Sequence, residues 1–110
     1  MRALVLAVVL PGLLACSGPG TPPTVRAPEK HTVTIEAVAY APATITVKAG
    51  DSIVWVNKDP FPHTVTSKAD GFDSAPLQPD QSWTLTTSKP GEMSYVCTLH
   101  PNMKGTIKVQ

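Results

Sequence analysis

Three side chains that bind soft metals recur at intervals of three near the C-terminal end of the chain. Cys97, His100 and Met103 share the segment 97–103, so a thiol, an imidazole and a thioether would lie on one tight loop between two strands and face one concavity. A thiolate, imidazoles and a thioether suit copper that changes between Cu(I) and Cu(II), whereas calcium and magnesium prefer oxygen ligands. The spacing therefore predicts a copper-binding loop.

A second imidazole is available from His63, in the segment Phe61-Pro62-His63-Thr64-Val65. His31 lies where a proline-rich segment meets the first β-prone run, and we expect it to be an ordinary exposed histidine. Met93 alternates with Tyr95, which favours a role in the core. Taken singly, His63 could be a loop histidine and Cys97 a small buried hydrophobe. Their joint occurrence favours a metal site.

Short β-prone runs separated by turn residues must position these ligands, because from about residue 31 onward no stretch has a sustained helical period. The apolar residues of 52–57 occupy both faces, which predicts a central strand covered on both sides. Residues 83–87 and 93–97 are expected to pair as an antiparallel hairpin, and residues 66–81 form a long polar excursion of unassigned structure. We predict an all-β, Greek-key β-sandwich of about six to eight strands. The expected strands lie in residues 32–37, 44–48, 52–57, 83–87, 93–97 and 105–109.

These segments together resemble the cupredoxin family of blue (type 1) copper proteins, and especially its short-loop members similar to amicyanin, pseudoazurin and plastocyanin. The resemblance covers residues 33–110. It rests on the segments Ile45–Asp51, Val54–Asp59, Pro62–Val65 and, most specifically, Tyr95–Met103. The resemblance implies that His63, Cys97 and His100 are the strong equatorial ligands of one copper ion and that Met103 is the weak axial ligand. It also implies a carrier of single electrons.

Two positions depart from the family pattern. Thr64 stands where many members have an asparagine that braces the loop carrying the cysteine, so we expect this brace to be weaker or differently made. Leu99 stands where amicyanin-like loops usually have proline, which could make the loop more mobile.

We expect the edge of the His100 ring to lie near the surface. An apolar patch of Phe61, Pro62, Leu99 and Pro101 around it would be the docking face for redox partner proteins, such as a c-type cytochrome or a dehydrogenase, in brief encounters.

Two other function classes remain open. A membrane-tethered copper carrier or storage protein would use the same ligands, but the chain lacks the Met-rich or His-rich tracts that favour such a role. An enzyme with Cys97 as nucleophile and His100 as base would need a third, orienting group that the sequence does not identify. We therefore predict that the protein is not an enzyme.

The N-terminal segment indicates export and lipid anchoring. Residues 1–15 are an apolar run of signal-peptide length, and Leu13-Leu14-Ala15-Cys16 resembles a bacterial lipobox, in which Cys16 would be lipidated. Residues 16–30 would be a flexible Pro-rich tether, and residues 31–110 the cupredoxin domain. These features predict a location in the periplasm, or on another extracytoplasmic face, of a bacterial membrane. A Cys16–Cys97 disulfide is the alternative.

The composition excludes some partners. A formal net charge of +1 and a sequence pI near 7.8 provide no basic surface for nucleic acid. One small domain of this size is expected to be a monomer.

Overall fold

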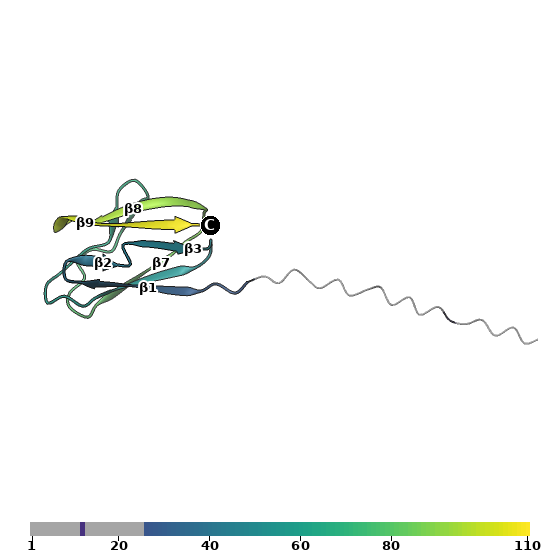
Figure 1. The fold of residues 1–110 in the computed structure, drawn as a ribbon, viewed down its shortest axis with the longest axis horizontal. Coiled ribbons are helices and arrows are strands. Elements are labelled where there is room, and N and C mark those ends of the chain that lie inside the picture. The colour runs from purple at the N-terminus through teal and green to yellow at the C-terminus, as the bar shows by residue number, and fades with distance from the viewer. Residues whose placement is uncertain (1–11, 13–25) are drawn as a thin grey trace, which may run out of the picture.

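The folded part of the chain consists of β-strands in two facing sheets (Figure 1). The computed structural model describes residue 12 and residues 26–110, and within these residues it contains nine strands and no α-helix. One sheet has the order β2 (Ala39–Ala41), β1 (Lys30–Glu36), β4 (Ser52–Asn57), β7 (Ser82–Thr86). The other has the order β3 (Thr44–Val47), β9 (His100–Val109), β8 (Gly91–Cys97), β5 (Thr66–Ser67), β6 (Phe72–Asp73). The all-β sandwich predicted from the sequence is confirmed.

The chain passes repeatedly from one sheet to the other. Strands β1 and β4 are parallel neighbours in the first sheet, and β3 and β9 are parallel neighbours in the second. A parallel neighbour requires a crossover connection, whereas an antiparallel one can follow a short turn. One end of the sandwich therefore holds the end of β4, the end of β8 and the start of β9, and Figure 1 shows the C-terminus at the opposite end, beside the start of β1.

Alternating side chains from both sheets form the core. Ile35, Ile53 and Trp55 from the first sheet are fully buried, as are Tyr95 and Ile107 from the second. The indole N–H of Trp55 donates a hydrogen bond to the hydroxyl of Tyr95 at 3.1 Å, which satisfies a buried donor between the sheets. Burial raises the pKa of Tyr95 to about 12, although the hydrogen bond from Trp55 acts in the opposite direction. The Tyr95 hydroxyl therefore stays protonated.

Three details of the predicted strands need correction. The predicted number of strands is exceeded because three short strands were not expected: β2, of three residues, and β5 and β6, of two residues each, in the polar excursion 66–81. Strands this short produce no periodic pattern. Strand β4 is an internal strand as predicted, but it is buried on only one face, since Val54 and Val56 remain half-buried. The predicted hairpin of residues 83–87 and 93–97 is wrong, because β7 pairs with β4 and β8 pairs with β9.

The connection after β7 explains the wrong hairpin. The backbone N–H and the hydroxyl of Thr87 both donate to the carbonyl oxygen of Asp51, and the N–H of Gly50 donates to the carbonyl of Thr87. These bonds hold the chain against the turn before β4 instead of letting it fold back beside β7. From there it crosses to the second sheet.

The ordered domain begins before residue 31. Strand β1 starts at Lys30, and the preceding residues are fastened by the carboxylate of Asp51, which is 1% exposed. This carboxylate accepts hydrogen bonds from the Arg26 guanidinium (2.7 Å) and from the backbone N–H groups of Glu29 (2.9 Å) and Lys48 (3.0 Å), and His31 Nε2 lies 2.9 Å from it. Residues 26–30 are therefore not a flexible tether, and His31 is a half-buried partner of Asp51, not a freely exposed histidine.

Candidate metal centre

His63 enters the site from the loop after β4, and its backbone is fixed on both sides. It forms an isolated β-bridge with Leu77, in which the two residues exchange hydrogen bonds of 3.1 Å and 2.7 Å. The side-chain amide of Asn57, at the end of β4, donates to the carbonyl oxygens of Phe61 and Leu77. These bonds fasten a loop without regular structure to its neighbours on both sides of His63, whose imidazole is fully buried.

Cys97 and His100 face each other at the closed end of the β8–β9 hairpin. Cys97 is paired with His100, and Val96 is paired with Lys104. The three residues 101–103 therefore have no partners in register and form a bulge, which carries Met103. Cys97 is a free thiol that is fully buried, and Cys16, the other half of the alternative disulfide, lies outside the described residues.

The three strong candidate ligands converge. Cys97 Sγ lies 3.7 Å from His63 Nδ1 and 3.7 Å from His100 Nδ1. The ligand atoms of these three residues all lie within 4.8 Å of one another. Met103, three residues after His100, is also buried, with an exposed fraction of 3%. Two imidazole nitrogens directed at one sulfur are the arrangement that a soft-metal site of this ligand set requires.

The hydrogen bond of His63 leaves the correct nitrogen free for a metal. His63 Nε2 lies 2.7 Å from Asp59 Oδ2. Burial opposes ionisation of Asp59, but hydrogen bonds from Val38, His63 and Ala37 outweigh it and hold the pKa of Asp59 below its ordinary value. The carboxylate can then only accept, so the proton is on Nε2 and the lone pair of Nδ1 points toward Cys97. The residues therefore fit a copper ion without rearrangement of the tautomer.

Thr64 braces the cysteine loop through both its backbone and its side chain. Its backbone N–H donates to Cys97 Sγ at 3.3 Å, and its hydroxyl oxygen accepts from the N–H of Thr98 at 2.9 Å. The same hydroxyl lies 3.2 Å from Thr98 Oγ1 and 2.9 Å from Thr66 Oγ1. Tyr40 adds a hydrogen bond from its hydroxyl to the carbonyl oxygen of Thr64. The loop of His63 and the loop of Cys97 are thus joined by side-chain and backbone bonds together.

Sequence reasoning missed two residues of this site, Asp59 and Tyr40. Burial, with a smaller contribution from the charge on Cys97, raises the pKa of Tyr40, so its hydroxyl remains a donor. The position of Asp59, four residues before His63, could be seen in the sequence, but nothing there showed that its side chain would be buried. Its burial depends on the β1–β2 turn, which no local pattern connects with residue 59.

The surface around His100 is apolar. Among the described residues the large hydrophobic side chains that remain exposed are Leu99 (48%), Val38 (41%) and Phe61 (38%). The ring centroid of Phe61 lies 5.7 Å from that of His100. A hollow of about 350 Å³ at this end is lined by Val38, Leu99, His100, Pro101, Asn102 and Met103.

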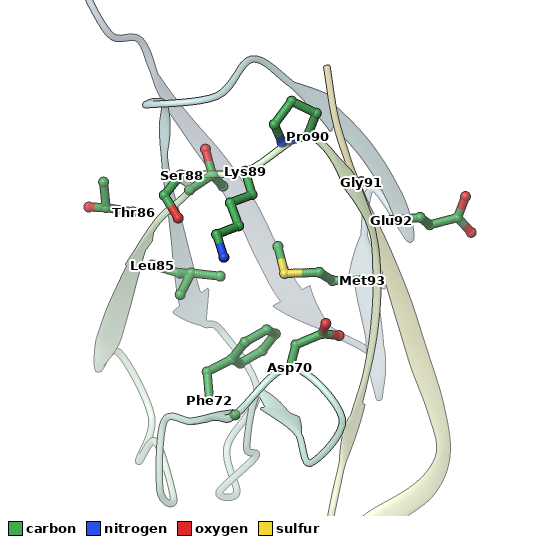
Figure 2. Close-up of a pocket in the computed structure, with 12 residues that line it drawn as sticks. Asp70, Phe72, Leu85, Thr86, Ser88, Lys89, Pro90, Gly91, Glu92 and Met93 are labelled. Atoms are coloured by element: carbon green, nitrogen blue, oxygen red, sulfur yellow. The ribbon is translucent and has the colours of Figure 1, made fainter.

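Other hollows lie away from the ligands. A cavity of about 600 Å³ opens between β7 and β8, and Figure 2 shows Phe72, Leu85 and Met93 around it with Lys89 reaching over them. Met93 packs against the core, as predicted. Glu29, His31 and Asp51 form a second cluster of potential ligand atoms, but the Asp51 carboxylate already has the four partners described above.

A buried thiol and two imidazoles joined on a β-sandwich, with a buried thioether in the same loop, define the class of type 1 copper sites. A family model described as a cupredoxin-like domain matches residues 4–109. The chain therefore belongs to the cupredoxin family.

Relatives with known names agree with this membership. The chain is 35% identical over 83 residues to amicyanin of Paracoccus versutus, covering 71% of this chain and 63% of that relative. It is 30% identical over 119 residues to amicyanin-alpha of Methylorubrum extorquens, covering 100% of both, and 34% identical over 87 residues to chloroplastic plastocyanin of Tetradesmus obliquus, covering 67% of this chain and 60% of that relative. The chain thus spans less than two thirds of the Paracoccus amicyanin that it matches.

Solved structures give the same result. The oxidised form of a methionine-to-leucine mutant of amicyanin superposes with a TM-score of 0.69 at 29% identity, covering 73% of this chain and 81% of that chain. A copper-containing nitrite reductase from Thermus scotoductus has a TM-score of 0.69 at 28% identity, but only 22% of that chain is covered.

Proposed function

We propose that this protein is an electron carrier that binds one type 1 copper ion through His63, Cys97, His100 and Met103. The observation that carries the proposal is the convergence of both Nδ1 atoms on the Cys97 sulfur at 3.7 Å. A copper ion held there would gain and lose one electron. The fold contributes rigidity: hydrogen bonds hold the ring of His63 and join its loop to the loop of Cys97, so little rearrangement would accompany a change of charge.

Several features favour a carrier over an enzyme. His63 Nε2 is occupied by Asp59, and the hydroxyl of Tyr40 is occupied by the Thr64 carbonyl, so neither is free to exchange a proton with a substrate. The nitrite reductase that matches is a much larger protein, of which this chain corresponds to about one fifth. The copper-carrier alternative shares the ligands and is separated from electron transfer by the measurements below.

The first test is the visible and EPR spectrum of the purified chain titrated with Cu(II). We expect an intense blue absorption and a small copper hyperfine splitting that saturate at one equivalent. Cys97→Ser should abolish both, because the thiolate is the origin of the blue colour. Cys16→Ser is the matched control and should leave the spectrum unchanged. A pale, ordinary Cu(II) spectrum would exclude the type 1 site and favour copper binding of another kind.

The electron-transfer role requires a docking face, for which we propose Phe61, Pro62, Leu99 and Pro101, extended by Val38. The exposure of Leu99, Val38 and Phe61 around His100 supports this surface. Leu99→Lys should slow electron transfer to a soluble c-type cytochrome at least about tenfold while the blue spectrum persists, because an apolar contact is replaced by a hydrated charge. Thr84→Lys, on the exposed face of β7, should change the rate little. Equal rates for Leu99→Lys and the parent chain would exclude this face.

We also propose that the protein is exported and held on an extracytoplasmic membrane surface by a lipid on Cys16. The segments that support this proposal, the apolar run 1–15 and Cys16, lie outside the described residues apart from Gly12. Fractionation of expressing bacteria tests it: the parent chain should be found with membranes and Cys16→Ser in the soluble fraction. Identical distribution of the two would exclude the lipid anchor.

A further inference from the structure

The carboxylate of Asp59 contacts two separate segments of the chain, the loop of His63 and the turn at Ala37 and Val38. Oδ2 accepts from the ring of His63 at 2.7 Å and from the backbone N–H of Val38 at 2.9 Å, while Oδ1 accepts from the N–H of Ala37 at 2.7 Å. Its own backbone N–H donates to Asn57 Oδ1 at 2.9 Å. The residue is 5% exposed. One buried charge therefore joins a copper ligand to the turn between β1 and β2.

That turn has an unusual backbone. Ala37 and Val38 have φ angles of 52° and 58°, which place both in the left-handed region. A β-branched residue such as valine rarely adopts this conformation, which persists only where the surroundings enforce it. The two N–H groups of the turn point at the two oxygens of Asp59. The two hydrogen bonds to the Asp59 carboxylate therefore hold the turn in this conformation.

The turn is also part of the surface around the site. Val38 is 41% exposed and lines the same hollow as Leu99, His100 and Met103. The Asp59 carboxylate consequently connects a buried copper ligand on one side with the proposed docking face on the other.

We propose that Asp59 is a positioning residue that couples the copper ligand His63 to the β1–β2 turn of the docking face. This inference rests on the proposed copper function. A metal on His63 Nδ1 fixes the ring, the ring fixes the carboxylate through Nε2–H, and the carboxylate fixes the amides of Ala37 and Val38. The reduction potential and the order of the turn are therefore set together. The negative charge of Asp59 also favours the oxidised, more positive state of the site.

The first measurement is the reduction potential of Asp59→Asn. We expect the equilibrium with a redox mediator to shift about tenfold toward the reduced protein, which corresponds to about 59 mV for a one-electron couple. Asp59→Glu retains the charge and should shift the equilibrium much less. Asp80→Asn is the matched control, because Asp80 is an exposed carboxylate whose partner is Lys58, and asparagine tolerates its φ of 65°. An unchanged potential in Asp59→Asn would overturn the electrostatic part of the proposal.

The second measurement begins with the parent chain. Amide hydrogen exchange is compared between the metal-free and Cu(I)-loaded parent chain by NMR. Exchange at Ala37 and Val38 should slow by about tenfold or more when copper is bound. Hydrogen-bond partners of metal ligands typically change metal affinity by about 10- to 100-fold, and tenfold is the lower end of that range. The amide of Gln110, which donates to the Val47 carbonyl at the opposite end, serves as the reference. In Asp59→Asn the slowing at Ala37 and Val38 should disappear.

The outcomes separate this inference from the proposed function. A blue, electron-accepting protein in which the exchange of Ala37 and Val38 does not respond to loading would overturn the coupling and leave the copper function standing. A chain that binds no copper would overturn both. A purely structural role for Asp59 would lower the stability of Asp59→Asn without changing how exchange responds to the metal.

Discussion

Thr64 takes part in the copper site through its backbone and through its side chain. The backbone N–H reaches the Cys97 sulfur, which any residue at this position except proline could do. The side-chain oxygen accepts a hydrogen bond from the N–H of Thr98 and lies close to the Thr98 hydroxyl, so this contact requires a side-chain oxygen at the position that Oγ1 occupies. The family asparagine is therefore replaced by a shorter side chain that is paired with a second threonine.

Replacement of Thr64 by valine tests this brace. Thr64→Val keeps the backbone bond to Cys97 but removes the acceptor of the Thr98 N–H, so the free energy of unfolding should fall by about 1–3 kcal/mol. Urea denaturation of the metal-free protein measures this loss, and NMR measures faster amide exchange at Thr98. Thr64→Ser keeps the hydroxyl and should leave the exchange at Thr98 slow. Exchange at Thr98 that stays slow in Thr64→Val would mean that the hydrogen bond to the hydroxyl does not protect this amide.

At this scale the sequence was informative about ligands and less so about their supports. Cys97, His100 and Met103 follow one another at a spacing that the chemistry of copper explains, and His63 completes the set. Asp59 and Val38 could not be joined in the same way, because the contact between them exists only after β1, β2 and the loop beyond β4 have come together. Contacts of this kind depend on the tertiary structure, and the sequence separation between the two residues follows no helical or strand periodicity.

The hairpin of β8 and β9 carries three of the four ligands and depends on one small residue. Gly105 pairs with Tyr95 across the hairpin, and a Cβ atom added to Gly105 would overlap the Tyr95 ring. That ring packs edge-on against Trp55 and Tyr40, with centroids 5.4 Å and 4.6 Å away, so it has little room to move. Glycine at this position lets the ring lie flat across β9.

Gly105→Ala should therefore destabilise the protein through overpacking. We expect the free energy of unfolding to fall by about 1–3 kcal/mol, measured by urea denaturation, since core rotamers or the backbone must shift. Ser94→Ala, at an exposed position of β8, should have a much smaller effect. Tyr95→Phe should not rescue Gly105→Ala, because ring carbons as well as the hydroxyl occupy the space. Parent-like stability of Gly105→Ala would show that the ring can move after all.

Strand location was predictable from the sequence, but strand pairing was not. Leu85 and Met93 face the same interior and border the same cavity, yet they belong to different sheets (Figure 2). An apolar alternation reports which face is buried and does not report which sheet the strand joins. The bonds of Thr87 to the turn at Asp51 decide the pairing, and their long separation in sequence hides them.

On the scale of the whole molecule, the two ends of the sandwich differ in character. The ligands and the exposed Val38, Phe61 and Leu99 lie at the end where β8 passes into β9. The C-terminus lies at the other end, as do residues 26–30, which Asp51 fastens (Figure 1). A chain attached through its N-terminus would thus present the apolar surface away from its point of attachment.

The stability of that far end should depend on pH through Asp51. The hydrogen bond from the Glu29 backbone, followed by those from His31, Lys48 and Arg26, outweighs burial and lowers the pKa of Asp51 well below its ordinary value. As pH falls, the unfolded chain therefore takes up the proton first, near its ordinary pKa of about 3.9. The stabilisation is fully present above that pH and is lost progressively as pH falls from there toward the lower pKa of the folded state.

Asp51→Asn should consequently lower the Tm at pH 7 by several degrees, and the difference from the parent chain should shrink as the pH falls below about 4. Thermal unfolding followed by circular dichroism between pH 7 and pH 2.5, on metal-free protein, measures the difference. Asp80→Asn removes an exposed carboxylate and should track the parent chain throughout, because surface ion pairs contribute little. A Tm difference for Asp51→Asn that stays constant over this range would mean that the shape of the side chain, not its charge, holds residues 26–30 against the domain.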